Sequence, residues 1–95
     1  TPQIIKNEAI RALMDGFTKY TAVAGSPELI KAIKVKLRRE NNLVYDAGDI
    51  IANVGAKQSL FNLTQALIDE GDEVIVPAPY WVTYPEIIKY AGGKI

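Results

Sequence analysis

Residues 54–58, with the sequence Val-Gly-Ala-Lys-Gln, contain the groups with the clearest capacity for chemistry. They close an apolar run and open a segment with helical spacing, so they predict a turn from a strand into a helix. The first N–H groups of a helix have no partner within it and lie at the positive end of its dipole, so they suit a phosphate or a carboxylate. Gly55 and Ala56 would let an anion approach the backbone, and Lys57 would add a positive charge. Taken alone, a glycine here is also explained by the bend itself.

The segments on either side of this turn predict a parallel βαβ unit. Residues 49–54 are almost continuously apolar, as in a strand that is buried on both faces. Residues 73–76 form a second short apolar strand, and Pro77-Ala-Pro-Tyr-Trp follows at its carboxyl end, where ligands of open α/β sheets bind. We therefore expect the turn and the aromatic ring of Trp81 at one edge of the sheet, where they would fit a planar, phosphorylated ligand.

Two helices are expected in this second half of the chain. The first follows the turn and places one side against a core. Its core-facing residues are Leu60, Phe61, Thr64, Leu67 and Ile68. The second starts near Pro85, turns Ile87, Ile88 and Ala91 inward, and stops at Gly92.

The first 48 residues predict a helical scaffold. Thr1 would cap and Pro2 would open a first helix that Gly16 ends, and Ser26 would cap a second helix over residues 27 to about 41. The residues expected to face a core are Ile5, Ala9, Ala12 and Leu13, then Leu29, Ile33 and Leu37. Lysines and arginines crowd the second half of the second helix. Because cations near a helix C-terminus offset the dipole, we interpret them as a solvated face rather than a site for an anionic partner.

Five motifs along the chain occur in one order. They are residues 18–21, 24–29, 54–58, 71–74 and 79–85. Together they resemble the class I aspartate aminotransferase family, whose members are pyridoxal-phosphate (PLP) enzymes of fold type I. The resemblance covers essentially the whole chain, and Lys57 is similar to the lysine of the bacterial-type aspartate and prephenate aminotransferase branch. It implies an α/β fold: residues 1–48 would be a helical scaffold with an interface loop, and residues 49–95 a βαβα unit with a phosphate turn.

The resemblance implies a cytoplasmic, homodimeric enzyme that transfers an amino group from L-aspartate or L-glutamate to a 2-oxo acid. The PLP phosphate would bind at Gly55, Ala56 and Lys57, and Trp81 would stack on the pyridine ring and reach the substrate carboxylate. The Lys57 side chain would contact the distal carboxylate of the substrate, and Tyr20 would donate to the phosphate in the partner subunit. Simpler interpretations are a core aromatic for Trp81, a loop tyrosine for Tyr20 and a solvated lysine for Lys57.

The resemblance also implies that catalytic residues lie outside these 95 residues. Family members are several times longer, and their PLP-binding lysine, the aspartate at the pyridine nitrogen and the arginine for the substrate α-carboxylate all lie downstream. The chain starts without an initiator methionine and ends at the expected start of another strand. We therefore expect a fragment of the large PLP-binding domain that is inactive by itself. The resemblance further predicts a cis peptide at Ala78–Pro79, which would turn Trp81 toward the ligand.

The composition restricts the alternatives. With no cysteine and no histidine, the chain has no thiolate metal ligand and lacks the commonest metal ligand and general base, so we expect no metal. Zero net charge and the lack of a run of about 20 apolar residues give no reason to expect nucleic acid or a membrane. Two alternatives remain open: another fold type I PLP enzyme (a C–S lyase, a cyclopropane-forming synthase, an aromatic or prephenate aminotransferase), or a non-catalytic phosphate-binding α/β module. The sequence contains neither G-x-x-x-x-G-K-[ST] nor G-x-G-x-x-G, the motifs that would support such a module.

Overall fold

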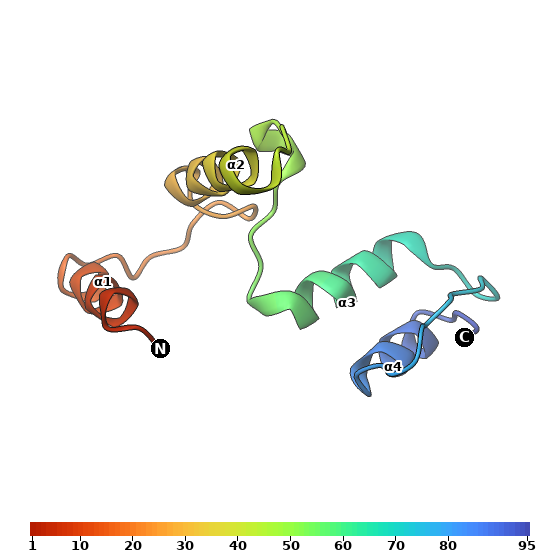
Figure 1. Ribbon diagram of the computed structural model, residues 1–95. Coiled ribbons are helices and arrows are strands. Elements are labelled where there is room, and N and C mark those ends of the chain that lie inside the picture. Colours follow the sequence, from red (N-terminus) through yellow and green to blue (C-terminus); the bar gives the residue numbers. More distant parts are fainter. The chain divides into compact units, whose positions relative to one another are not determined.

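The computed structural model describes all 95 residues as two units, residues 1–51 and 52–95. The first unit contains the helices α1 (Gln3–Met14) and α2 (Pro27–Asn41) and the short 3₁₀ helix η1 (Ala47–Asp49), and the second contains α3 (Gly55–Leu67) and α4 (Thr83–Tyr90) (Figure 1). The expected helices are therefore present, in the expected order.

The ends of α1 follow from its terminal residues. The helix begins at Gln3, one residue later than expected, because Pro2 occupies the cap position and no side chain caps it. At the other end the N–H groups of Gly16 and Phe17 donate to the carbonyls of Leu13 and Ala12, at 3.1 and 2.9 Å. Gly16 has a φ of +76°. This is a Schellman motif, in which the left-handed residue is usually glycine, so Gly16 ends the helix as predicted.

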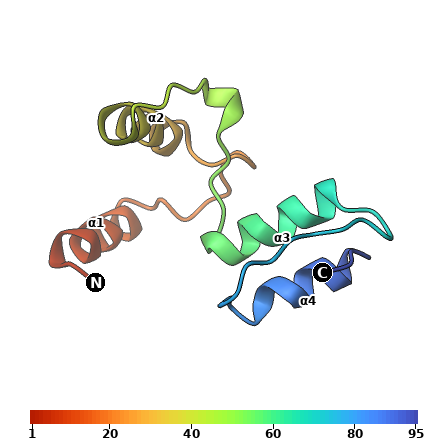
Figure 2. The same ribbon diagram turned by 45° about the vertical axis from the view of Figure 1, so that its right-hand side comes forward.

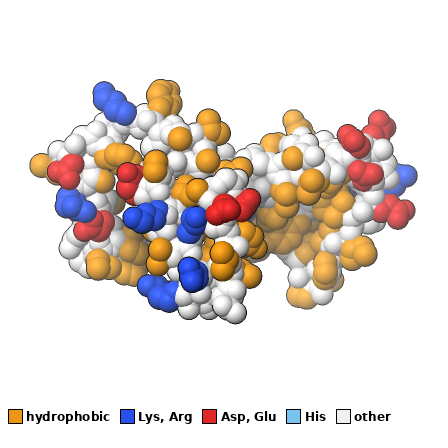
Figure 3. All heavy atoms as spheres, turned by 90° about the horizontal axis from the view of Figure 1, so that it is seen from above, with side chains coloured by type: hydrophobic (Ala, Val, Ile, Leu, Met, Phe, Trp, Pro, Cys, Tyr) orange, Lys and Arg blue, Asp and Glu red, His pale blue; other side chains and the backbone are white.

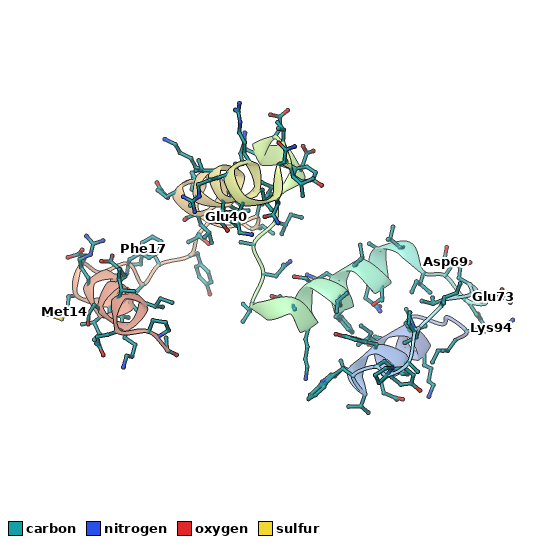
Figure 4. The ribbon with its side chains drawn as sticks, viewed as in Figure 1. Met14, Phe17, Glu40, Asp69, Glu73 and Lys94 are labelled. Atoms are coloured by element: carbon teal, nitrogen blue, oxygen red, sulfur yellow. The ribbon has the colours of Figure 1, made fainter.

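The predicted buried stripe of α1 is wrong. Ile5, Ala9 and Leu13 are exposed, and only Ala12 is half-buried. Met14 and Phe17, labelled in Figure 4, are exposed as well. The reason is that no other element of this unit packs on α1, so its apolar face has nothing to be buried against.

The helix α2 has the expected ends and a slightly different buried face. The Ser26 hydroxyl accepts a hydrogen bond from the Leu29 N–H at 3.3 Å, which caps the helix at Pro27 as predicted. Leu29 itself is exposed and Ile30 is buried instead. The buried face follows the element that packs on the helix, which is η1, and Ile50 directly after η1 is also buried.

Several of the lysines and arginines near the end of α2 form ion pairs with acidic residues. Lys36 lies 3.6 Å from Glu40, and Lys34 lies 3.8 Å from Asp46. Arg39 donates a hydrogen bond to Glu40, and this bond, with the charges of Arg39 and Lys36, lowers the pKa of the Glu40 carboxyl. All of these groups are at least partly exposed, which is typical of a solvated charged face.

In the second unit α3 and α4 lie side by side (Figures 1 and 2). Ile88 of α4 is buried between them, and the rings of Phe61 and Tyr90 approach with centroids 5.6 Å apart. The closest packing is at Gly93, where a Cβ would lie 2.9 Å from methyl groups of both Ile68 and Ile88. Glycine is therefore required there by space.

One side of α3 remains partly open. Leu60, Thr64 and Ile68 are half-buried as predicted, whereas Phe61 and Leu67 are exposed, which corrects the expected core face. Leu67, with its neighbours Leu60, Leu63 and Thr64, lines an apolar groove of about 410 Å³ together with α4 and residues 74–77. Figure 3 shows hydrophobic side chains over a broad area of the right-hand half of the view, which contains α3 and α4.

The two predicted strands are not formed as regular strands. Residues 50–53 form no regular structure and have no strand partner, Val54 lies in a bend, and η1 replaces the start of the first strand. The only parallel pairing joins Glu73 to Lys94, with the Val74 N–H donating to the Lys94 carbonyl at 2.8 Å (Figure 4). A strand is stabilised by hydrogen bonds to its neighbours, and these 95 residues supply a neighbour only for residues 72–74.

Candidate functional site

The turn before α3 has the geometry of an inverse γ-turn. Val54 has φ −78° and ψ 72°, and the N–H of Gly55 donates to the carbonyl of Asn53 at 2.9 Å. Gly55 itself has a φ of +82°, and a Cβ built on it would meet no atom within 4 Å. The amide of Gly55 is thus used within the chain, and the space beside its Cα is open for a ligand to approach.

Two backbone amides at the start of α3 are free. The N–H groups of Ala56 and Lys57 have no acceptor in the chain, because the cap residue Val54 offers no side-chain oxygen. In α2, by contrast, the hydroxyl of Ser26 satisfies the corresponding position. The free amides and the dipole of a 13-residue helix make this end able to bind an anion.

Side chains on both sides of the turn hold it in place. The Gln58 side-chain oxygen accepts from the N–H of Val54 at 2.6 Å, and the Asn53 amide donates to the Ser59 hydroxyl at 3.0 Å. We call Asn53, Gln58 and Ser59 the turn clasp. None of these three residues was predicted to belong to the site. The available signal was Gln58, which lies one position later than the glutamine of a capping box and makes the same bond to the cap N–H.

Trp81 lies beside the turn, as the sequence analysis predicted. The Lys57 ammonium is 5.4 Å from the centroid of the Trp81 ring, within the range of a cation–π contact. The ring is 60% exposed, so Trp81 is not a core aromatic in this structure. The predicted cis peptide at Ala78–Pro79 is present in the segment that leads to it.

This arrangement can bind and orient a ligand. Free amides and a lysine ammonium would hold anionic groups, and the exposed indole would take a flat ring and donate through its N–H. The carboxylates near the end of α3 are remote from it: Asp69 and Glu73 lie at the opposite end of α3 from Gly55 (Figure 4). The Asp72 carboxylate accepts from the Asp69 N–H at 2.8 Å, so it stabilises the turn after α3.

Tyr20 belongs to a different part of the chain. It belongs to the unit of residues 1–51, in the loop between α1 and α2, and its side chain is fully exposed at 106%. Its expected contact is with a partner subunit, so that role stays a prediction.

No helix has both the length and the apolar character needed to cross a membrane. Acidic residues do not gather anywhere in a group of three or more that could hold a metal ion.

The profile of the family described as aminotransferase class I and II matches residues 1–95. The chain belongs to this family. The aspartate/prephenate aminotransferase of Nitrosomonas europaea is 56% identical over 94 residues, which cover 99% of this chain and 24% of that protein. The enzyme of the same name from Thermus thermophilus is 54% identical over 95 residues, which cover all of this chain and 25% of that protein.

The backbone agrees with this assignment. The aspartate aminotransferase of Rhizobium meliloti matches with a TM-score of 0.95 and 50% identity, over 99% of this chain and 24% of that one. The predicted fold class, part of a fold type I aminotransferase, is therefore confirmed, although the chain itself forms almost no strand. The chain spans about a quarter of the length of the relatives it matches.

Proposed function

We propose that the protein containing this chain is a PLP-dependent aminotransferase that moves an amino group from L-aspartate or L-glutamate to a 2-oxo acid. The observation that carries the proposal is the Lys57 ammonium above the Trp81 ring, next to the free amides of Ala56 and Lys57. Its similarity to aspartate/prephenate aminotransferases supports the same reaction class.

The residues of the site fit PLP. The phosphate would bind the amides of Ala56 and Lys57, while Gly55 would contribute its left-handed conformation and its missing side chain. The pyridine ring would stack on Trp81, which is exposed. Bound PLP would supply the electron sink for the reaction of the amino acid, and the protein would supply orientation. In a cytoplasmic homodimer, Tyr20 would donate to the phosphate of the partner's cofactor.

Lys57 would select acidic substrates. Its backbone N–H serves the phosphate, so its side chain is available for the distal carboxylate of aspartate or glutamate. A lysine suits this role because its point charge sits on a flexible stem and can follow carboxylates at two different distances. The indole N–H of Trp81 would donate to a carboxylate of the same substrate.

The proposal is tested with the full-length gene product. Purified protein should bind PLP, with an absorption band near the visible edge, and should transfer the amino group of aspartate to 2-oxoglutarate. A protein that binds PLP but acts only on neutral amino acids or on C–S bonds would belong to another activity on the same fold. A protein that binds phosphate but not PLP would be the non-catalytic module.

A second candidate is prephenate aminotransferase activity, because the similar proteins carry both names. It is measured in the same preparation with glutamate or aspartate as the donor and prephenate as the acceptor. The two candidates share the donor and hence the proposed role of Lys57.

A further inference from the structure

The turn before α3 is held by side chains that contribute nothing to a core. Gln58 is exposed, and its one hydrogen bond within the chain is the 2.6 Å contact with the N–H of Val54. Removing that side chain would therefore remove little packing and would release the residue whose ψ angle directs the start of α3. The second bond of the clasp, from Asn53 to Ser59, is partly buried and would keep the turn folded.

The bond of Gln58 also decides which amides an anion meets. With the N–H of Val54 donated to Gln58 and the N–H of Gly55 donated to Asn53, the free donors are those of Ala56 and Lys57. If Val54 were released, its exposed N–H would bond to water, and the direction of the two free donors would be less firmly fixed, although the bond from Asn53 to Ser59 would keep the turn folded. Preorganised donors bind more tightly than donors that must be ordered on binding.

We propose that Gln58 is a positioning residue for the phosphate group of the ligand, acting through Val54 on the amides of Ala56 and Lys57. The inference rests on the proposed function, and it deepens it by assigning the phosphate affinity partly to a side chain that does not touch the phosphate. The proposal also accounts for a neutral amide at this position: a glutamate could accept from Val54 equally well, but its negative charge would lie at the same end of α3 as the amides of Ala56 and Lys57 and would repel the phosphate.

Two substitutions separate the hydrogen bond from the charge. Gln58→Met keeps the length of the side chain and removes the acceptor. Gln58→Glu keeps the acceptor and adds a negative charge near the helix N-terminus, where it favours the helix but repels an anion. Gln65→Met is the matched control, because Gln65 is exposed in the same helix and makes no side-chain hydrogen bond.

The experiment measures the Kd of the full-length apoprotein for PLP and for pyridoxal, which lacks the phosphate, with thermal unfolding of each variant recorded in parallel. Gln58→Met should weaken PLP binding about three- to tenfold, the size of one neutral hydrogen bond, and pyridoxal binding less than twofold. Gln58→Glu should weaken PLP binding by more than tenfold without lowering the unfolding temperature. Gln65→Met should change none of these values.

Three results would overturn the inference. Equal loss of PLP and pyridoxal affinity in Gln58→Met would mean a general structural role, and unchanged PLP affinity would mean no role. Wild-type PLP affinity in Gln58→Glu would mean that the phosphate does not bind close to this end of α3. If the wild-type protein itself binds PLP no better than pyridoxal, the phosphate site fails and the proposed function fails with it, which is distinct from failure of Gln58 alone.

Discussion

Replacing Lys57 should change the choice of substrate more than the affinity for the cofactor. Lys57→Ala deletes the ammonium but keeps the backbone N–H at the start of α3, because that amide belongs to the main chain. A charge-assisted hydrogen bond to a substrate carboxylate contributes about 1.5–3 kcal/mol. Against this, Lys57 gives up its contact with the exposed Trp81 ring when it turns to the substrate, which costs about 0.5–1 kcal/mol.

The difference leaves about 1–2 kcal/mol, so kcat/KM for aspartate and glutamate should fall roughly 5- to 30-fold in the full-length enzyme. The value for alanine or phenylalanine should change less than threefold, and the Kd for PLP should change little. The assay is initial-rate kinetics with each donor at a fixed 2-oxo acid, beside a PLP titration of the apoprotein.

Lys57→Met and Lys89→Ala serve as controls. Methionine retains an apolar side chain of similar length without the charge, so it should reproduce the loss for acidic donors if charge is the cause. Lys89 is an exposed lysine of the same unit that pairs with Glu86 at 3.1 Å, and its replacement should leave every rate unchanged. An equal loss for acidic and neutral donors in Lys57→Ala would refute the reasoning and would assign Lys57 to the cofactor.

Three further predictions concern stability and folding. Gly55→Ala should lower the free energy of unfolding of the full-length protein by about 1–2 kcal/mol because of its φ of +82°, whereas Gly48→Ala, in equally open space without a positive φ, should be neutral in the same denaturant titrations. Gly93→Ala should cost about 1–3 kcal/mol, since its Cβ would overlap two isoleucine methyl groups, and wild-type stability would contradict the packing. The 95-residue chain by itself should show no transaminase activity. It should also show no cooperative thermal transition by circular dichroism, because the isoleucines that it buries are only Ile30, Ile50 and Ile88. Activity in a preparation free of host enzymes, or a sharp transition, would disprove this.

The ends of the helices were predictable because they depend on neighbouring residues. Ser26 and Pro27 start α2 through one hydroxyl and one fixed φ, and Gly16 ends α1 through a left-handed residue. The buried faces were less predictable. An apolar stripe indicates that a helix face can be buried, but no other element packs on α1, and the buried face of α2 is the one that η1 contacts.

The site was predictable in its outline. A turn of small residues after one apolar segment, and Trp81 after the next, share an edge in any parallel α/β arrangement, and the contact between Lys57 and Trp81 agrees with it. The assignment of the individual amides was not predictable, because it depends on the backbone angles of Val54, which turn the N–H of Gly55 back to Asn53.

Residue types and spacing thus predicted the helices to within a residue or two and the turn before α3, since each of these depends on short stretches of chain, and the resemblance of five short motifs gave the family. Strand pairing depends on segments far apart in the sequence, so the pairing of Glu73 with Lys94 across α4 was decided only in the tertiary structure, and residues 50–54 stayed without a partner. The direction of the free amides of Ala56 and Lys57 also depends on the folded structure. The side chain of Gln58 folds back over one turn of α3 to accept from the N–H of Val54, and this bond helps to fix the turn that carries the amides.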